Sequence, residues 1–212
     1  MNVVTIPRYQ KIVDEISGLN WSALNRNELM AVSCAYYYFS VQFRENLEIA
    51  CELYPEDPNL AELRKGECDT ANLSPCPGIA EKGEKLNHDE FMRRVIARGS
   101  LDQGARERVE RLGLSYLAEV RRVDPLTKAM SIASYEDGGL ERVFTAILPA
   151  ADWDEPSLRA FHHFLVGHIE FDSDPDAGHG SLCRHMVPDD RIVPLWSAFR
   201  NLLVGAAPSL AK

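Results

Sequence analysis

Histidines are the residues of this sequence best suited to chemistry, because five of the six lie between positions 162 and 185. Within that stretch, His168 and Asp172 are four residues apart in a segment with helical spacing, so their side chains leave one face. The sequence then breaks at 174–178, and His179 follows. Imidazole and carboxylate donors that converge in this way suit iron, zinc or manganese. We therefore expect His168, Asp172 and His179 to bind a metal ion.

The other histidines of this stretch have a plainer interpretation. His162 and His163 are adjacent, so they cannot both face a core, and at least one of them is expected to be structural. His185 is expected to lie on the surface. A histidine can also cap a helix or bond a carbonyl without binding a metal, so a set of structural histidines is the alternative to a metal site.

Helical patterns predict the elements that position these residues. Apolar residues recur at helical spacing, and no window alternates as a strand would. Pro58 and Pro125 suit first helical turns, and Asn87 with Glu90 forms a capping-box arrangement. We expect an all-α fold of about eight helices around one core, forming a single domain over residues 1–212. The expected helices cover 7–17, 25 or 27 to 54, 58–69, a segment from 87, 100–122 (with Ser100 and Gln103 as its cap), 125–136 with a resumed pattern over 140–148, 154–172, and 189–203.

One long segment, Thr70 to Lys85, has no helical pattern and contains two prolines and two glycines. Loops of this length inside compact domains are often lids or binding loops. A solvated surface excursion is an equally good interpretation.

Composition narrows the function classes. The 212 residues carry a formal net charge of −9 without a basic cluster, which argues against a surface that binds duplex nucleic acid. The longest nearly apolar run, Met30 to Val41, is too short to cross a bilayer, and the first residues do not resemble a signal peptide. The five cysteines, 34, 51, 68, 76 and 183, are widely spaced, so we expect reduced thiols in a cytoplasmic protein.

Four segments, taken together, resemble the heme-oxygenase-like superfamily. The segment Phe161–Asp172 (FHHFLVGHIEFD), with GHGSL at 178–182, resembles its last core helix. The other three, in the same order along the chain, are LRKGE at 63–67, NHDEF at 87–91, and ASYE at 133–136 followed by LERVF at 140–144. That superfamily includes thiaminase II, pyrroloquinoline-quinone synthase and the heme-oxygenase-like di-iron oxidases and oxygenases. The resemblance spans residues 30 to 205 and implies a heme-oxygenase-like helical bundle.

Carried over residue by residue, the resemblance to the di-iron members implies a set of six metal ligands. The first carboxylate is open between Glu67, Asp69, Glu81 and Glu84, and we favour Glu67 because it lies on a predicted helix. His179 follows Asp172 at a longer spacing than is common in the di-iron members, so it can reach the others only through a turn at 174–175. The implied ligands are Glu67, His88, Glu136, His168, Asp172 and His179.

Glu141 is five positions beyond Glu136 in the same helical pattern, so the two point about 140° apart. We expect Glu136 to face the site and Glu141 to face solvent beside Arg142.

The resemblance implies a metal-dependent, O2-using oxidase or oxygenase that contains two iron ions per chain and acts on a small organic molecule. Manganese in place of one iron and a homodimer both remain open, whereas nucleic-acid and membrane partners are not expected. Haem degradation is set aside because haem-binding members use an early axial histidine, and no histidine precedes residue 88. Aromatic residues that could line the site, or belong to the core, are Tyr36, Tyr37, Phe39 and Tyr135.

Other functions remain as alternatives. A thiaminase-like hydrolase would use Cys183 as its nucleophile. A cofactor-free oxidase or hydrolase would use the histidines as general acids and bases. A zinc site from His179, Cys183 and His185, and a helical binding protein without catalytic activity, complete the set.

Overall fold

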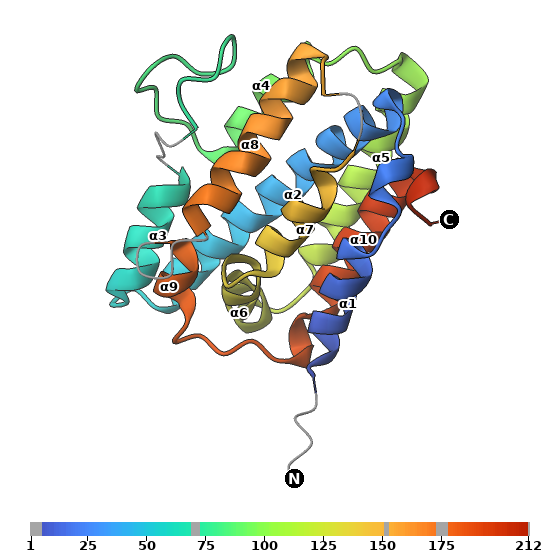
Figure 1. The fold of residues 1–212 in the computed structure, drawn as a ribbon. Coiled ribbons are helices and arrows are strands. Elements are labelled where there is room, and N and C mark those ends of the chain that lie inside the picture. The colour runs from blue at the N-terminus through green and yellow to red at the C-terminus, as the bar shows by residue number, and fades with distance from the viewer. Residues whose placement is uncertain (1–5, 69–72, 151–152, 173–177, 212) are drawn as a thin grey trace.

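The structure, a computed structural model, describes residues 6–68, 73–150, 153–172 and 178–211, except for the side chains of Cys68, Phe171 and Asp172. Within these ranges the chain is all-α, with helices packed as a bundle and no strand (Figure 1). The α-helices are α1 (Arg8–Ser17), α2 (Arg26–Leu53), α3 (Pro58–Cys68), α4 (His88–Arg98), α5 (Gln103–Val120), α6 (Pro125–Glu136), α7 (Gly139–Ile147), α8 (Pro156–Asp172), α9 (His179–Cys183) and α10 (Val193–Ala206). Short 3₁₀ helices cover Trp21–Ala23, Asp190–Ile192 and Pro208–Ala211.

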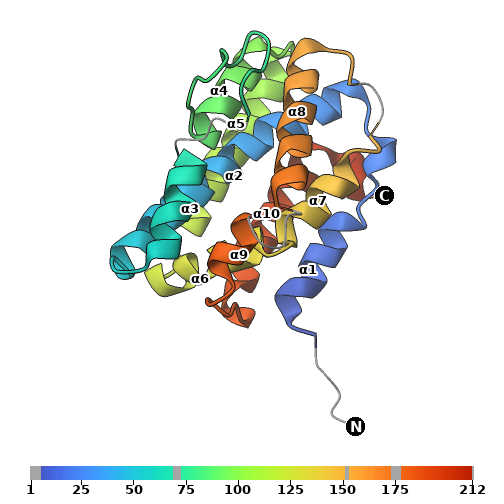
Figure 2. The same cartoon turned by 60° about the vertical axis from the view of Figure 1, so that its left-hand side comes forward.

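The bundle is organised around α2, which has 28 residues and runs through its middle (Figures 1 and 2). This helix contacts α3, α4, α5, α6, α8 and α10. Its buried residues lie on all sides, as expected for a helix surrounded by others. Two buried amides of α2 bond to α6: Gln42 donates to the Tyr135 hydroxyl (3.0 Å) and Asn46 donates to the Ser131 hydroxyl (3.1 Å). These bonds fix the position of α6 along α2.

Most helix starts follow the predicted capping chemistry. Pro58 and Pro125 are the first residues of α3 and α6, and the side chain of Asn87 caps α4 by accepting a backbone hydrogen bond. The predicted cap at Ser100 is wrong, because Asp102 caps α5 instead. An aspartate carboxylate directly before the helix accepts a hydrogen bond from a free N–H group of the first turn, and Asp is as favourable in this position as Ser.

The chain has ten α-helices in its described part where about eight were expected, and the difference arises mainly at Gly138 and at α9. Gly138 adopts a left-handed conformation, with φ 84°, which separates α6 from α7. Glu136 and Glu141 therefore lie on different helices. The prediction that both belong to one helical pattern, about 140° apart, is wrong for this reason. Glu136 is nevertheless buried, and Glu141 is half-buried in the first turn of α7.

The segment 73–87 is irregular, which confirms the expected loop over its described part. It is fixed to the bundle by His163, whose Nε2 donates to the Leu73 carbonyl (3.0 Å), and by Arg94, which donates to the Ile79 carbonyl (2.8 Å). Glu84 pairs with Arg94 at 2.9 Å. None of the described helices is long and apolar enough to cross a membrane.

Candidate metal centre

Five of the six predicted ligands come together inside the bundle, each contributed by a different helix. Glu67 lies in the last turn of α3, and Glu136 is the last residue of α6. His88 and His179 are the first residues of α4 and α9, and His168 lies on α8. All five are buried, with at most 7% of any residue exposed.

The five residues form two groups that share Glu67, and within each group the donor atoms all lie within 4.8 Å of one another. We call Glu67, His88 and His168 the histidine-rich triad. We call Glu67, Glu136 and His179 the carboxylate-rich triad. His168 and His179 therefore belong to different triads, which are joined through Glu67. The helix α9 contacts α3 and α6, which carry the two carboxylates beside His179. The side chain of Asp172 lies outside the described residues.

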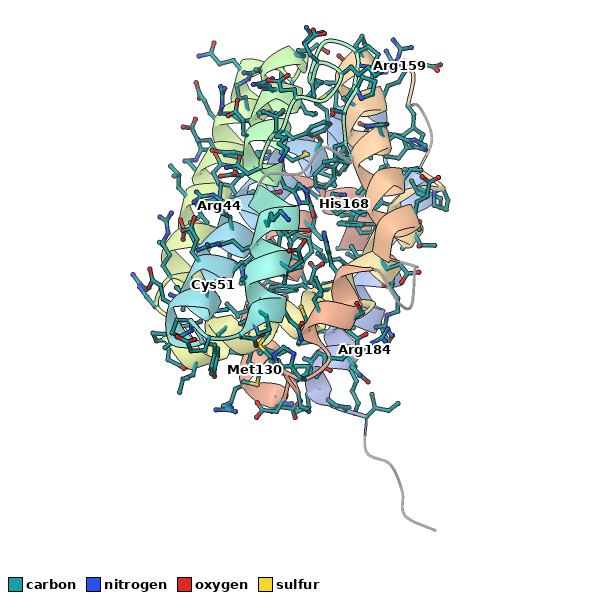
Figure 3. The ribbon with its side chains drawn as sticks, turned by 90° about the vertical axis from the view of Figure 1, so that its left-hand side faces the viewer. Arg44, Cys51, Met130, Arg159, His168 and Arg184 are labelled. Atoms are coloured by element: carbon teal, nitrogen blue, oxygen red, sulfur yellow. The ribbon has the colours of Figure 1, made fainter. Side chains whose placement is uncertain are left out.

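In the histidine-rich triad, His88 Nδ1 lies 2.6 Å from Glu67 Oε2 and 3.2 Å from His168 Nε2. His168 Nδ1 donates a hydrogen bond to the Phe164 carbonyl at 2.7 Å. A neutral His168 therefore carries its lone pair on Nε2, the atom that faces the triad. A backbone carbonyl that fixes the tautomer in this way is the usual support of a metal-binding histidine. Figure 3 shows His168 between the ribbons of α8 and α3.

In the carboxylate-rich triad, His179 Nδ1 lies between two carboxylates. It is 2.5 Å from Glu67 Oε1 and 3.4 Å from Glu136 Oε2. The Glu67 carboxylate thus presents one oxygen to each triad. Such a group can bridge two cations.

Burial and mutual charge shift the pKa values of these side chains in opposite directions. Burial alone would raise the pKa of Glu67, but His88 and His179 outweigh it and hold that pKa well below its usual range. Burial and the charge of Glu67 raise the pKa of Glu136. Burial and the neighbouring His88 lower the pKa of His168 to about 3, so its imidazole is neutral.

His179 behaves differently from His168. Burial favours its neutral form, but the two carboxylates dominate and raise its pKa to about 11. A proton on His179 therefore balances the negative charge of Glu67 in the metal-free protein. A bound cation would supply the same positive charge and release this proton.

Both carboxylates of the site lie at the C-terminal ends of helices. Glu67 and Glu136 stand at helix C-termini, where the partial negative charge of the helix disfavours another anion. Two carboxylates at helix C-termini therefore form a favourable environment for a cation.

Two buried atoms of the site support the same conclusion. Glu67 Oε1 and His88 Nε2 are buried and form no hydrogen bond with the described residues. Buried polar atoms normally form hydrogen bonds, and buried charges are paired or bind metals. Glu67 Oε1 is paired by its 2.5 Å contact with His179, so His88 Nε2 is the atom of the two that lacks a partner among the described residues.

A small cavity adjoins both triads. It offers about 10 Å³ to the centre of a water-sized molecule, which is room for about one water. Tyr36 is the only one of the four proposed lining aromatics that borders it. Phe39 and Tyr135 are core residues, and Tyr37 packs against the core. Besides Tyr36 and the predicted ligands, the cavity is lined by Ser40, Phe43 and Leu140, which were not predicted from the sequence.

The remaining candidates lie elsewhere. Glu81 and Glu84 belong to the segment 73–87, outside both triads, and Asp69 lies outside the described residues. His185 is a surface residue that pairs with Asp57 at 2.6 Å, as expected. It forms no metal-binding group with His179 and Cys183, although all three are described, so the proposed zinc site is wrong.

The two adjacent histidines have structural contacts, in agreement with the expectation for at least one of them. His163 bonds the Leu73 carbonyl, and His162 packs edge-on against Trp153 with ring centroids 4.9 Å apart.

Comparisons of the chain with protein-family models, curated proteins and solved structures found no match.

Proposed function

We propose that this protein is a non-haem di-iron oxidase or oxygenase that uses O2 to oxidise a small organic molecule. The observation that carries the proposal is the pair of buried triads joined by Glu67. Two adjacent sets of imidazole and carboxylate donors suit two first-row transition metals, and the resemblance of the sequence favours iron.

The protein residues have distinct tasks in this proposal. His88 and His168 would hold one iron, Glu136 and His179 would hold the other, and Glu67 would be shared between them. Iron held at this site would supply electrons for the reduction of O2. The Phe164 carbonyl holds the His168 ring in the orientation and tautomer that binding requires.

Apolar aromatic residues keep water away from the site. Phe164 stacks against His168, with ring centroids 4.1 Å apart, and Phe144 packs edge-on against the same ring at 5.7 Å. Tyr36 contacts both phenylalanines and borders the small cavity. An enclosed site with so little free space limits the access of bulk water and hence side reactions with it.

The donor sets of the triads differ, which bears on the choice of metal. Two imidazoles and one carboxylate suit iron, whereas two carboxylates and one imidazole also suit manganese. The carboxylate-rich triad is therefore the position at which manganese would replace iron.

A thiol nucleophile is disfavoured by the surroundings of Cys183. This cysteine is fully buried, and burial together with the nearby carboxylates of Glu136 and Glu67 raises its pKa far above the usual range. A reactive cysteine needs a lowered pKa and an exposed sulfur. The thiaminase-like alternative therefore lacks its nucleophile.

Iron loading under anaerobic conditions tests the proposal. The wild-type chain should bind about two iron ions, one for each triad, and should then consume O2 faster than the same amount of free iron. Glu67→Ala should lose both ions, because it removes the ligand that the triads share. His185→Ala is the control and should behave as wild type. A wild-type chain without bound iron, or O2 uptake unchanged in Glu67→Ala, would contradict the proposal.

A further inference from the structure

Gly66 directly precedes Glu67 on α3, and the ring of His179 lies next to the position that a Cβ atom of residue 66 would occupy. We infer that Gly66 is a positioning residue: the absence of a side chain there lets His179 approach α3 closely enough to complete the carboxylate-rich triad. This inference rests on the proposed function, since it concerns the second of the two proposed metal positions.

The space at Gly66 is filled by the imidazole itself. A Cβ atom at this position would lie 2.8 Å from His179 Nε2 and 3.6 Å from the two ring carbons beside it. Non-bonded carbon and nitrogen atoms do not approach so closely, so any side chain at this position must displace the ring. The other ring nitrogen, Nδ1, is the atom 2.5 Å from Glu67 Oε1. Displacement of the ring therefore acts directly on the metal-binding atom.

The short helix α9, which begins with His179, is also closely packed on α6 (Figure 2). A Cβ atom at Gly180 would lie 2.9 Å from the Glu136 carbonyl oxygen and 3.3 Å from the Asp137 Cα. Glycines at both contacts allow the short helix to fit between the ends of α3 and α6. The backbone that carries His179 is thus held against α6 while its ring lies against Gly66, and 5% of the residue is exposed.

The variant Gly66→Ala distinguishes an effect on the position of the His179 ring from an effect on the stability of α3. Alanine is the better helix former, so Gly66→Ala should not weaken α3 itself. Any loss of metal must then come from the displaced His179 ring. Gly104→Ala on α5 is the matched control, because it makes the same change in a helix remote from the site, and its nearest new contact is 3.4 Å away.

The experiment is a double-mutant cycle with iron count per chain and circular dichroism as readouts. After anaerobic loading with ferrous salt, wild type and Gly104→Ala should hold two ions, one for each triad. Gly66→Ala, His179→Ala and the double variant Gly66→Ala/His179→Ala should each hold one. In the absence of the His179 ring, the Gly66→Ala change has nothing to displace, so it should cause no further loss of iron. After one-electron chemical oxidation of the loaded proteins with ferricyanide, the EPR signal of a magnetically coupled Fe(II)Fe(III) pair should be present only in the two chains that hold both ions.

The outcomes distinguish this inference from the proposed function. Two irons in Gly66→Ala, with two in wild type, would overturn the positioning role and leave the di-iron proposal intact. A wild-type chain that binds no iron would overturn both. If Gly66→Ala is poorly folded, the double variant decides: helical content restored to that of His179→Ala supports a contact between Gly66 and His179, and helical content that stays low contradicts it.

Discussion

Glu136 is a buried carboxyl group whose raised pKa shows that the folded protein disfavours its ionised form. At pH 7 the ionised form therefore destabilises the metal-free protein, because the unfolded chain holds the same charge in water. A metal ion would remove this penalty by supplying an opposite charge. Glu141, half-buried in the first turn of α7, has no such environment.

We therefore predict that Glu136→Ala leaves about one iron ion per chain, because it removes a ligand from one of the two triads. Glu141→Ala should retain both ions. In the metal-free protein, Glu136→Gln should be as stable as wild type or more stable, as measured by urea unfolding at pH 7 in the presence of a chelator. Equal iron loss in the two alanine variants would show that Glu136 has no special part in binding.

His168 gives a prediction about pH. Its pKa is lowered from 6.5 to about 3, so between these values the unfolded chain binds a proton that the folded chain does not. The contribution of His168 to stability is therefore present above pH 6.5 and is lost as the pH falls towards 3. For one such proton, the free energy of unfolding falls by about 1.4 kcal/mol per pH unit.

His168→Gln should reduce this slope, because an amide does not take up a proton. The measurement is urea unfolding of the metal-free proteins between pH 7 and 5. Wild type should lose stability more steeply than the variant over this range. Parallel pH profiles would mean that His168 is not held neutral in the folded protein.

At the scale of helices and loops, the ligands depend on the ends of the helices that carry them. His88 is the first residue of α4, and Asn87 caps that helix by accepting the Glu90 N–H at 3.2 Å. Loss of a cap costs about 1 kcal/mol and frays the first turn. Fraying at α4 would move His88 directly.

Asn87→Ala should therefore weaken iron binding as well as stability. Asp102→Ala removes a comparable cap from α5, which carries no ligand, and should lower stability alone. Competition with a chelator of known affinity measures the first effect, and unfolding of the metal-free proteins measures the second. Equal iron affinity in the two variants would contradict a dependence of His88 on its cap.

Capping and first-turn residues are also the features of the elements that could be predicted from sequence. Asn87 and Pro58 act locally, within one turn, so their types alone indicate where α4 and α3 begin. The break at Gly138 was harder to predict, since a glycine within a helical pattern is compatible with a weakened helix as well as with a left-handed turn. The position of α9 depends on contacts with α3 and α6, which no local pattern contains.

At the scale of the whole molecule, α2 contributes no ligand but contacts four of the five helices that do: α3, α4, α6 and α8. The ligands are spread from Glu67 to His179 in the sequence, so only the complete bundle assembles them. The spacing of His168, Asp172 and His179 predicted a metal site, and the resemblance supplied Glu67, His88 and Glu136. The division into two triads could not be predicted, because it depends on close approaches such as that of Gly66 to His179.

The most direct test of the two-metal account is anomalous X-ray diffraction from crystals of the iron-loaded protein, with data collected on both sides of the iron absorption edge. The account predicts two iron peaks on opposite sides of the Glu67 carboxylate, one beside His88 and His168 and the other beside Glu136 and His179. A single peak, or iron bound only outside these two triads, would contradict it.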